Sequence, residues 1–233
     1  MAIKEKDFVE LEYTGKLKDD NSVLDTTDEK TAKDSAIYQK GQRFGKVIIC
    51  IGEGYILKGL EKELVGKEPG KEYTISLPTE SAFGKKSAQM VQLIATNKFV
   101  KEGINPQVGL QINVDGMFGV IRTVTGGRTL VDFNHPLAGK DVVYTVKVSR
   151  IVTDANEKVK GLLELQFGKE MAKSEIKDGN LEVKLQFDMP LEYTQKLADQ
   201  FKTLIPEIKN VSFVKEAKEV KVNKEGKAKE EKV

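Results

Sequence analysis

The side chains that could carry out acid–base, nucleophilic or metal chemistry are few in this chain. It contains one histidine, His135, and one cysteine, Cys50. A single cysteine excludes an internal disulfide, and the two residues are too few to build a zinc site from histidine and cysteine ligands. A Ser–His–Asp triad would have to use His135, and no G-x-S-x-G segment accompanies it. We therefore expect neither a zinc enzyme nor a serine hydrolase, whereas oxygen-ligand metal sites stay open on composition alone.

The segment G-E-G-Y-I-L-K-G, residues 52–59, is similar to a phosphate-binding loop only in part. The third glycine of a G-x-G-x-x-G motif would be residue 57, which is leucine. No G-x-x-x-x-G-K-[ST] motif occurs either. The sequence therefore does not support a nucleotide cofactor.

Two polar residues stand where they could serve a binding site. His135 lies between Asn134 and Pro136, which predicts a turn whose imidazole either makes a local hydrogen bond or lines a pocket. Asp25 is either a turn residue that caps nearby N–H groups or a carboxylate at the mouth of an apolar pocket. Aromatic residues more often form core than a ligand cage. That interpretation applies to Phe8, Tyr13, Tyr55, Phe83 and Tyr144.

Length and charge limit the classes that remain. The chain has 233 residues, of which 39% are hydrophobic and 32% charged, which suggests one to three domains with much surface. With 38 Lys and Arg against 36 Asp and Glu, the charge is too balanced to predict nucleic-acid binding. No apolar run approaches the ~20 residues that span a bilayer. The charged N-terminus shows no secretory signal, so we expect a cytoplasmic protein without a membrane partner.

Hydrophobic periodicity predicts the elements that would position these residues. Alternation over residues 7–17 predicts a half-buried strand, and Val47 to Ile51 a buried one. Helical spacing of Ile56, Leu57, Leu60 and Leu64, with Gly66 at the C-terminal cap, predicts a helix. Residues 21–46 are expected to be irregular and polar, apart from Val23-Leu24-Asp25 and Ile37-Tyr38. Further along we expect a strand that ends at Pro78, a strand at Met90–Ile94, a short helix at Thr96–Gly103, a meander of Leu110–Val114, Met117–Val124 and Thr129–Phe133 with hairpin turns, and a strand at Val142–Ile151.

The C-terminal third has a different pattern. D-A-N-E-K-V-K-G after Thr153 is predicted to be a linker. Strands are expected at Leu162–Phe167 and Leu181–Phe187, a helix at about 190–205 and a last strand at about 211–222. Residues 223–233 form a charged, low-complexity tail that is predicted to be disordered.

The order of motifs resembles a known family. F-V-E-L-E-Y-T-G-K-L, V-L-D-T-T, I-G-E-G-Y-I-L-K-G-L-E and A-F-G together resemble the FKBP-type peptidyl-prolyl isomerases. Leu60, where short eukaryotic members carry Trp, points to the SlyD-like branch, and L-V-D-F-N-H-P-L-A-G-K is similar to the end of its insert-in-flap domain. The match covers about residues 1–152, and the remainder is similar to the extra domain of long-type archaeal members.

This resemblance implies an α+β fold in which an antiparallel β-sheet wraps on a short helix. The isomerase domain would comprise residues 1–85 and 140–153, interrupted by a mostly-β insert-in-flap domain at 86–139. A small α+β domain would follow at 157–222. The tail at 223–233 would complete the chain.

The resemblance also implies the site residues. Rotation about an Xaa-Pro bond needs an apolar cleft that favours the twisted amide, and it requires no nucleophile, metal or cofactor. Asp25 would lie near the rotating carbonyl or pair with Tyr13, and an N–H of the first helical turn would hold the substrate carbonyl. The expected catalytic residues are Tyr13, Asp25, Ile56, Leu57, Phe83 and Tyr144; the expected substrate-binding residues are Leu24, Val47, Leu60, His135 and Leu137.

The insert is expected to supply affinity for unfolded or partly folded proteins and proline-containing peptides, through an apolar groove that tethers them. The candidate groove residues are Met90, Val91, Leu93, Ile94, Phe99, Met117 and Phe118, several of which we expect in the insert's own core.

Two departures from the family leave an alternative open. Phe83 stands where the family usually has Tyr, so a ligand-binding hydroxyl is lost, and the His-rich metal-binding tail of bacterial SlyD is absent. The alternative is therefore an FKBP-like chaperone or assembly module with little turnover. The thin core expected of the C-terminal domain also favours a homodimer through that domain, with a monomer nearly as well supported.

Overall fold

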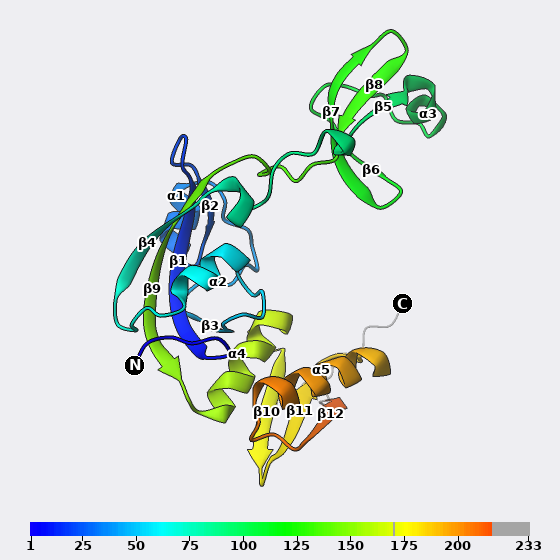
Figure 1. Ribbon diagram of the computed structural model, residues 1–233. Helices are drawn as coiled ribbons and strands as arrows, with labels where there is room; N and C mark the ends of the chain where they lie inside the picture. The colour runs from blue at the N-terminus through cyan, green and yellow to red at the C-terminus, as the bar shows by residue number, and fades with distance from the viewer. Residues whose placement is uncertain (170, 216–233) are drawn as a thin grey trace, which may run out of the picture. The chain divides into compact units, whose positions relative to one another are not determined.

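The computed structural model describes residues 1–169 and 171–215, which form two compact units that divide after Ile151 (Figure 1). Each unit is described separately. The first contains two antiparallel sheets and the second contains one mixed sheet. In the described part of the chain, no helix is long and apolar enough to cross a membrane.

The N-terminal sheet has five strands. Their order is β2-β1-β9-β4, and β3 also pairs with β1. The strands are β1 (Phe8–Leu17), β2 (Val23–Thr26), β3 (Val47–Cys50), β4 (Glu72–Leu77) and β9 (Val142–Val152). The predicted strands at 7–17, 47–51 and 142–151 are confirmed. Burial of apolar side chains fixes the place of these strands: in β1, Phe8, Val9 and Leu11 are at most 2% exposed.

Helix α2 (Lys58–Leu64) packs into this unit through Leu60 and Leu64, which are buried. Gly66, two residues beyond the helix, has φ of +84°, as expected of a glycine at a helix C-terminus. A short 3₁₀ turn, η1 (Thr79–Ser81), follows β4. Strand β2 covers Val23-Leu24-Asp25, the run that was excepted from the expected irregular segment at 21–46. The expectation is wrong for α1 (Glu29–Asp34), whose first turn is capped by the Asp28 carboxylate accepting from Thr31 N.

Residues 86–139, which we call the insert, form a sheet of their own. Strand order is β5-β8-β7-β6, all antiparallel. The elements are η2 (Ala88–Met90), β5 (Val91–Ala95), α3 (Thr96–Lys101), β6 (Gln111–Val114), β7 (Met117–Thr125) and β8 (Arg128–Asp132). The predicted meander and short helix are confirmed. Both hairpin turns place their two central residues at positive φ, at Asp115-Gly116 and Gly126-Gly127, as two-residue turns with right-handed twist require.

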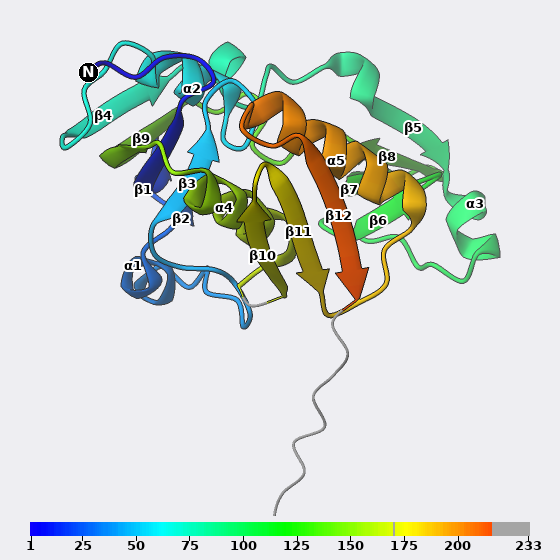
Figure 2. The same cartoon turned by 90° about the horizontal axis from the view of Figure 1, so that it is seen from below.

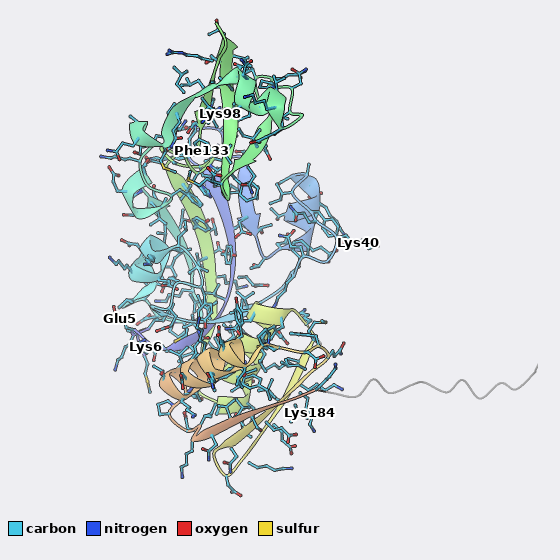
Figure 3. All side chains as sticks on the ribbon, turned by 90° about the vertical axis from the view of Figure 1, so that its right-hand side faces the viewer. Glu5, Lys6, Lys40, Lys98, Phe133 and Lys184 are labelled. Carbon is cyan, nitrogen blue, oxygen red and sulfur yellow. The ribbon has the colours of Figure 1, made fainter. Side chains whose placement is uncertain are left out.

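The insert has a small core and an ion pair whose carboxylate, Asp132, is buried. Phe133, labelled in Figure 3, belongs to the core together with Phe99, Ile112, Ile121 and Val131. The buried Asp132 carboxylate accepts from Arg122 Nη2 at 3.0 Å and from the backbone and side-chain nitrogens of Asn134 at 3.0 and 2.8 Å. Burial alone would raise the pKa of Asp132, but the hydrogen bonds from Asn134 and Arg122 outweigh it and lower the pKa.

This lowered pKa predicts acid sensitivity of the insert. A carboxylate whose folded pKa lies below its unfolded pKa of ~3.9 stabilises the fold above that value, and the contribution is lost as pH falls through the folded pKa. The protection of the β7 and β8 amides, which is their exchange rate corrected for the intrinsic pH dependence of exchange, should therefore be constant between about pH 7 and 5 and decrease below about pH 4. In Asp132→Asn, exchange should be faster at neutral pH and lose this acid step. An unchanged acid step in that variant would assign the sensitivity to other groups.

As far as residue 215, the C-terminal unit is a three-stranded sheet with two helices. Figure 2 shows its strands side by side in the order β10-β11-β12. The elements are α4 (Ala155–Phe167), β10 (Ala172–Lys177), β11 (Asn180–Leu185), α5 (Leu191–Leu204) and β12 (Asn210–Lys215). β10 and β11 are antiparallel, whereas β11 and β12 are parallel and are connected through α5. The expected strand at 181–187 and helix at about 190–205 are confirmed.

Two expectations for this unit are wrong. The residues predicted to form a linker after Thr153 and a strand at 162–167 form one helix, α4. Its first turn is capped by the Asp154 side chain, which accepts from Glu157 N at 2.9 Å. Val159, Leu162 and Leu163 are buried at helical spacing, so the apolar run at 162–167 is helical packing. Strand β10, A-K-S-E-I-K, was missed because Ile176 is its one large apolar residue. Residues 216–222 of the expected last strand and the predicted disordered tail at 223–233 lie outside the described residues.

Candidate functional site

A cleft of about 870 Å³ opens in the N-terminal unit. Its walls come from β1, β2, β9, the turn before α2, α2 itself, η1 with the loop after it, and the chain that returns from the insert. It is lined by Tyr13, Leu24, Asp25, Gly54, Tyr55, Ile56, Leu57, Lys58, Gly59, Lys62, Glu80, Ser81, Ala82, Phe83, His135, Leu137 and Tyr144.

Tyr13 and Asp25 form a hydrogen-bonded pair in this cleft. The Tyr13 hydroxyl donates to Asp25 Oδ2 at 2.8 Å. The backbone of Tyr13 is held by Thr27, whose Oγ1 accepts from Tyr13 N at 2.9 Å and whose N donates to Tyr13 O at 2.9 Å. Burial, with a further contribution from the Asp25 charge, raises the pKa of Tyr13 far above its ordinary value, so its hydroxyl stays protonated. Asp25 is therefore a held carboxylate in the wall of the cleft.

The ring of Tyr144 lies beside this pair. Its centroid is 6.0 Å from that of Tyr13, and burial, followed by the Asp25 charge, raises the pKa of Tyr144 to about 12. A Cβ on Gly15 would lie 2.5 Å from Cε1 of Tyr144. The glycine of the Y-T-G motif is therefore needed because the Tyr144 ring occupies the space of its missing side chain.

The backbone conformation of the turn before α2 explains why the segment G-E-G-Y contains two glycines. Gly52 and Gly54 have φ of +92° and +76°, which favours glycine. The buried Glu61 carboxylate accepts from Gly54 N at 3.0 Å and from Tyr55 N at 3.1 Å. This carboxylate holds the turn that brings Ile56 and Leu57 into the cleft. The backbone N–H groups of Gly54 and Tyr55 therefore bind Glu61, and the G-E-G-Y segment is a structural turn.

Gly59 is the closest packing point of α2. A Cβ added there would lie 2.2 Å from the carbonyl oxygen of Ser81 in η1, a backbone atom that cannot move alone. We predict that Gly59→Ala destabilises the protein by about 1–2 kcal/mol, as expected for overpacking at a rigid contact. Denaturant unfolding measures this value. The control is Lys62→Ala, on the same helix, which should change stability by less than about 0.5 kcal/mol. Equal stability of Gly59→Ala and wild type would show that η1 shifts to accommodate the added methyl group without a cost in stability.

His135 and Phe83 form a stacked pair at the side where the chain returns from the insert. Their ring centroids are 4.9 Å apart and their planes differ by 5°. His135 Nδ1 accepts a hydrogen bond from Leu137 N at 3.1 Å. Both alternatives posed for His135 therefore apply at once, because it makes a local hydrogen bond in a turn and also lines the cleft.

The structure brings together nine of the eleven residues expected in the cleft. Two of the expected residues, Val47 and Leu60, do not line it, since they are 7% and 1% exposed and belong to the core. They lie on the buried faces of β3 and α2, which the motif resemblance alone did not distinguish from the cleft face. Sequence reasoning missed the charged residues Lys58, Lys62 and Glu80 on the rim. It also missed Glu61, although a carboxylate shortly after a glycine turn is a capping signal.

The seven expected groove residues of the insert differ in how exposed their side chains are. Phe99 is 3% exposed in the core, and Met90 and Ile94 pack against it. Val91 is half-buried. The exposed members are Leu93 at 55%, Met117 at 42% and Phe118 at 77%. Among the described residues, no group of three or more His, Cys, Asp or Glu side chains could hold a metal ion.

Chemically, the cleft is suited to promoting rotation about a substrate bond that stays intact. Its lining is mostly aromatic and aliphatic, the phenols stay protonated, and Asp25 already accepts from Tyr13. An environment of this kind removes water from an amide and thereby lowers the penalty for losing its planar, polar form.

Two family models match the chain. The model described as "FKBP-type peptidyl-prolyl cis-trans isomerase" matches residues 1–114, and the model described as "FKBP26, IF domain" matches residues 92–137. The second match falls within the insert.

Curated relatives agree with these matches. The chain is 34% identical over 146 residues to the short-type peptidyl-prolyl cis-trans isomerase of Methanocaldococcus jannaschii, across 63% of this chain and 92% of that protein. It is 38% identical over 106 residues to the FKBP-type 16 kDa peptidyl-prolyl cis-trans isomerase of Escherichia coli, across 43% of this chain and 70% of that protein. It is 28% identical over 169 residues to SlyD of Treponema pallidum, across 70% and 86%. Since the match to the first relative spans nearly all of that protein, this chain belongs to the FKBP-type peptidyl-prolyl cis-trans isomerase family, in the SlyD-like form that carries an insert.

Proposed function

We propose that the protein is a folding catalyst with two binding sites. The cleft accelerates rotation about Xaa-Pro bonds, and the insert holds unfolded or partly folded chains so that their prolines reach the cleft repeatedly. The observation that carries this proposal is an uncovered apolar face on the insert sheet.

The two faces of that sheet have different partners. Gly119 and Ile121 of β7 face the core: Ile121 is fully buried, and a Cβ on Gly119 would lie 2.7 Å from side-chain atoms of Val131 and Phe133. Because side chains alternate along a strand, Phe118 lies on the opposite face.

Strands β5 and β8 extend this opposite face. Leu93 and Leu130 are register partners, and Leu130 points away from the core because its neighbour Val131 is buried in it. Phe118 is 77% exposed and Leu93 is 55% exposed. Exposed apolar surface of this kind is typical of a binding site for other chains, here the apolar stretches of unfolded proteins.

The same face provides a direct test. The double variant Leu93→Asn/Phe118→Asn should bind a permanently unfolded protein roughly tenfold or more weakly, because two large apolar contacts are lost. Its turnover of a prolyl tetrapeptide should stay unchanged. Val108→Asn is the matched control, since Val108 is 70% exposed but lies outside the sheet. Unchanged affinity for the unfolded protein would exclude this face as the binding surface.

The alternative is a chaperone or assembly module with little turnover, because Phe83 provides no hydroxyl to the cleft. A protease-free assay, in which cis–trans exchange of a prolyl peptide is followed by NMR, separates the two. Exchange well above the uncatalysed rate, which has a time constant of tens to hundreds of seconds, supports the isomerase. Binding of unfolded protein without such exchange supports the alternative.

We also propose the domain boundaries stated from the sequence, with the C-terminal domain beginning at residue 154 because Asp154 caps α4. We further propose a homodimer through that domain. Its support is β12, which lies at the edge of the sheet that residues 171–215 form and has Val214 46% exposed, and the exposed apolar side chains Leu191 and Tyr193 at the start of α5, at 72% and 62%. A cytoplasmic location stays a prediction.

The homodimer is tested by sedimentation equilibrium of the whole chain at tens of micromolar. A dimer mass that Leu191→Glu/Tyr193→Glu converts to a monomer mass is the expected result. A monomeric wild-type chain ends the proposal, and a variant that stays dimeric moves the interface away from the start of α5.

A further inference from the structure

The only imidazole in the sequence has a defined protonation pattern. Leu137 N donates to His135 Nδ1 at 3.1 Å, so that nitrogen must be unprotonated to accept. In a neutral imidazole the proton then resides on Nε2, as a donor. Nε2 is on the far side of the ring from the backbone, at the end of the side chain.

The orientation of this ring is fixed from two directions. One face stacks on Phe83, at 4.9 Å between centroids and 5° between planes. The backbone just before it is anchored through Asn134, whose side chain accepts from Ser87 N at 2.7 Å and donates to Ser87 O at 3.1 Å and to Asp132 at 2.8 Å. The ring is thus held by stacking and by its own loop, and both His135 and Phe83 line the cleft. With Nδ1 on the backbone and one face on Phe83, the edge that carries Nε2–H is the part of the ring left for a ligand in the cleft.

A prolyl segment in the cleft needs donors of this kind. The proline nitrogen carries no hydrogen, so polar recognition depends on the carbonyl oxygens of the segment, which lose water on binding. The Tyr13 hydroxyl already donates to Asp25. Among the hydrogen bonds of the described residues, His135 Nδ1 takes part in one, whereas Nε2 has no acceptor.

We propose that Nε2–H of His135 donates a hydrogen bond to a carbonyl oxygen of the prolyl segment bound in the cleft, and that Phe83 acts as a positioning residue for the imidazole. This inference rests on the isomerase function and identifies how the cleft recognises the polar groups of its substrate.

The single histidine makes the proposal directly measurable, because its imidazole ¹⁵N signals cannot be confused with others. They are recorded on the whole chain at about pH 8, where free histidine is neutral. The free protein should show the Nε2–H tautomer. Saturation with a blocked Ala-Leu-Pro-Phe peptide should move the Nε2–H proton downfield. A peptide with alanine in place of proline should cause a smaller shift at equal concentration.

Three results are distinguishable. An Nδ1–H tautomer in the free protein overturns the proposal. An imidazole that stays unchanged while the amide signals of Ile56 and Leu57 shift also overturns it, because the peptide then occupies the cleft without contacting His135. If neither the imidazole nor these amides respond, the cleft does not bind the peptide, and the isomerase function fails together with the proposal.

Kinetics provide a second measurement. His135→Phe keeps an aromatic ring for Phe83 to stack on but removes the donor, and it should lower kcat/KM for the tetrapeptide about three- to tenfold, the usual size of one neutral hydrogen bond. His135→Gln, which retains an N–H donor, should recover part of that loss. Wild-type kcat/KM in a folded His135→Phe protein overturns the proposal. A Gln variant as impaired as the Phe variant also overturns it, since the ring itself would then be what matters.

Discussion

Replacement of residues 86–139 by a short flap should reduce catalysis of proline-limited refolding by roughly a hundredfold, because tethering of the client chain is lost. Turnover of a prolyl tetrapeptide should fall far less, since so short a substrate has little to gain from tethering. Of the residues that line the cleft, only His135 and Leu137 lie in the insert; the others come from β1, β2, β9, the turn before α2, α2, and η1 with the loop after it. Refolding of a model protein and NMR exchange of the tetrapeptide, measured side by side, give the two rates.

The replacement also removes His135 and Leu137 from the cleft, so its design needs a matched control. A second variant replaces residues 91–132 alone and retains Asn134, His135 and Leu137. It should keep tetrapeptide turnover closer to that of the wild type and lose refolding catalysis to the same degree. Equal losses on both substrates in this second variant would mean that the insert builds the cleft and does not serve as a separate binding site.

Asp25→Ala should lower kcat/KM for a prolyl tetrapeptide by roughly tenfold to a hundredfold. We expect the Asp25 carboxylate to favour the twisted amide, in which resonance is lost and the carbonyl carbon becomes more positive. Fixed charges aimed at such a change contribute strongly in a dry site. The substitution also leaves the buried Tyr13 hydroxyl without the acceptor that it now has at 2.8 Å. Steady-state kinetics on a variant shown to be folded provide the measurement.

Asp28→Ala is the matched control for this variant. Asp28 is three residues away and outside the cleft, and its carboxylate caps α1 by accepting from Thr31. Its loss should cost about 1 kcal/mol of stability and leave turnover unchanged. Turnover in Asp25→Ala that matches Asp28→Ala would remove Asp25 from the catalytic group and leave it a structural partner of Tyr13.

Where the sequence pattern was strong, it predicted elements correctly. Alternation in β1, helical spacing in α2 and the D-G and G-G turns of the insert each reflect a local rule, and local rules do not depend on what packs nearby. The failures occurred where the rule is weak. The apolar run at 162–167 fits a buried strand and a helix equally well, and the Asp154 cap is the sequence feature that distinguishes them. Strand β10 is mostly polar, so only its pairing with β11 identifies it.

For the site, the sequence by itself determined which residue types were present. It excluded a zinc site of histidine and cysteine ligands, a complete glycine phosphate motif and a G-x-S-x-G nucleophile, and the motif order indicated most of the cleft residues. Only the tertiary structure decided which of these residues face the cleft. Val47 and Leu60 turn into the core, whereas Lys58, Lys62 and Glu80 reach the rim, because side-chain direction depends on how α2, η1 and β3 pack. The stacking of His135 on Phe83 joins residues 52 positions apart, and no local pattern encodes such a contact, since it exists only when the chain returns from the insert to the cleft.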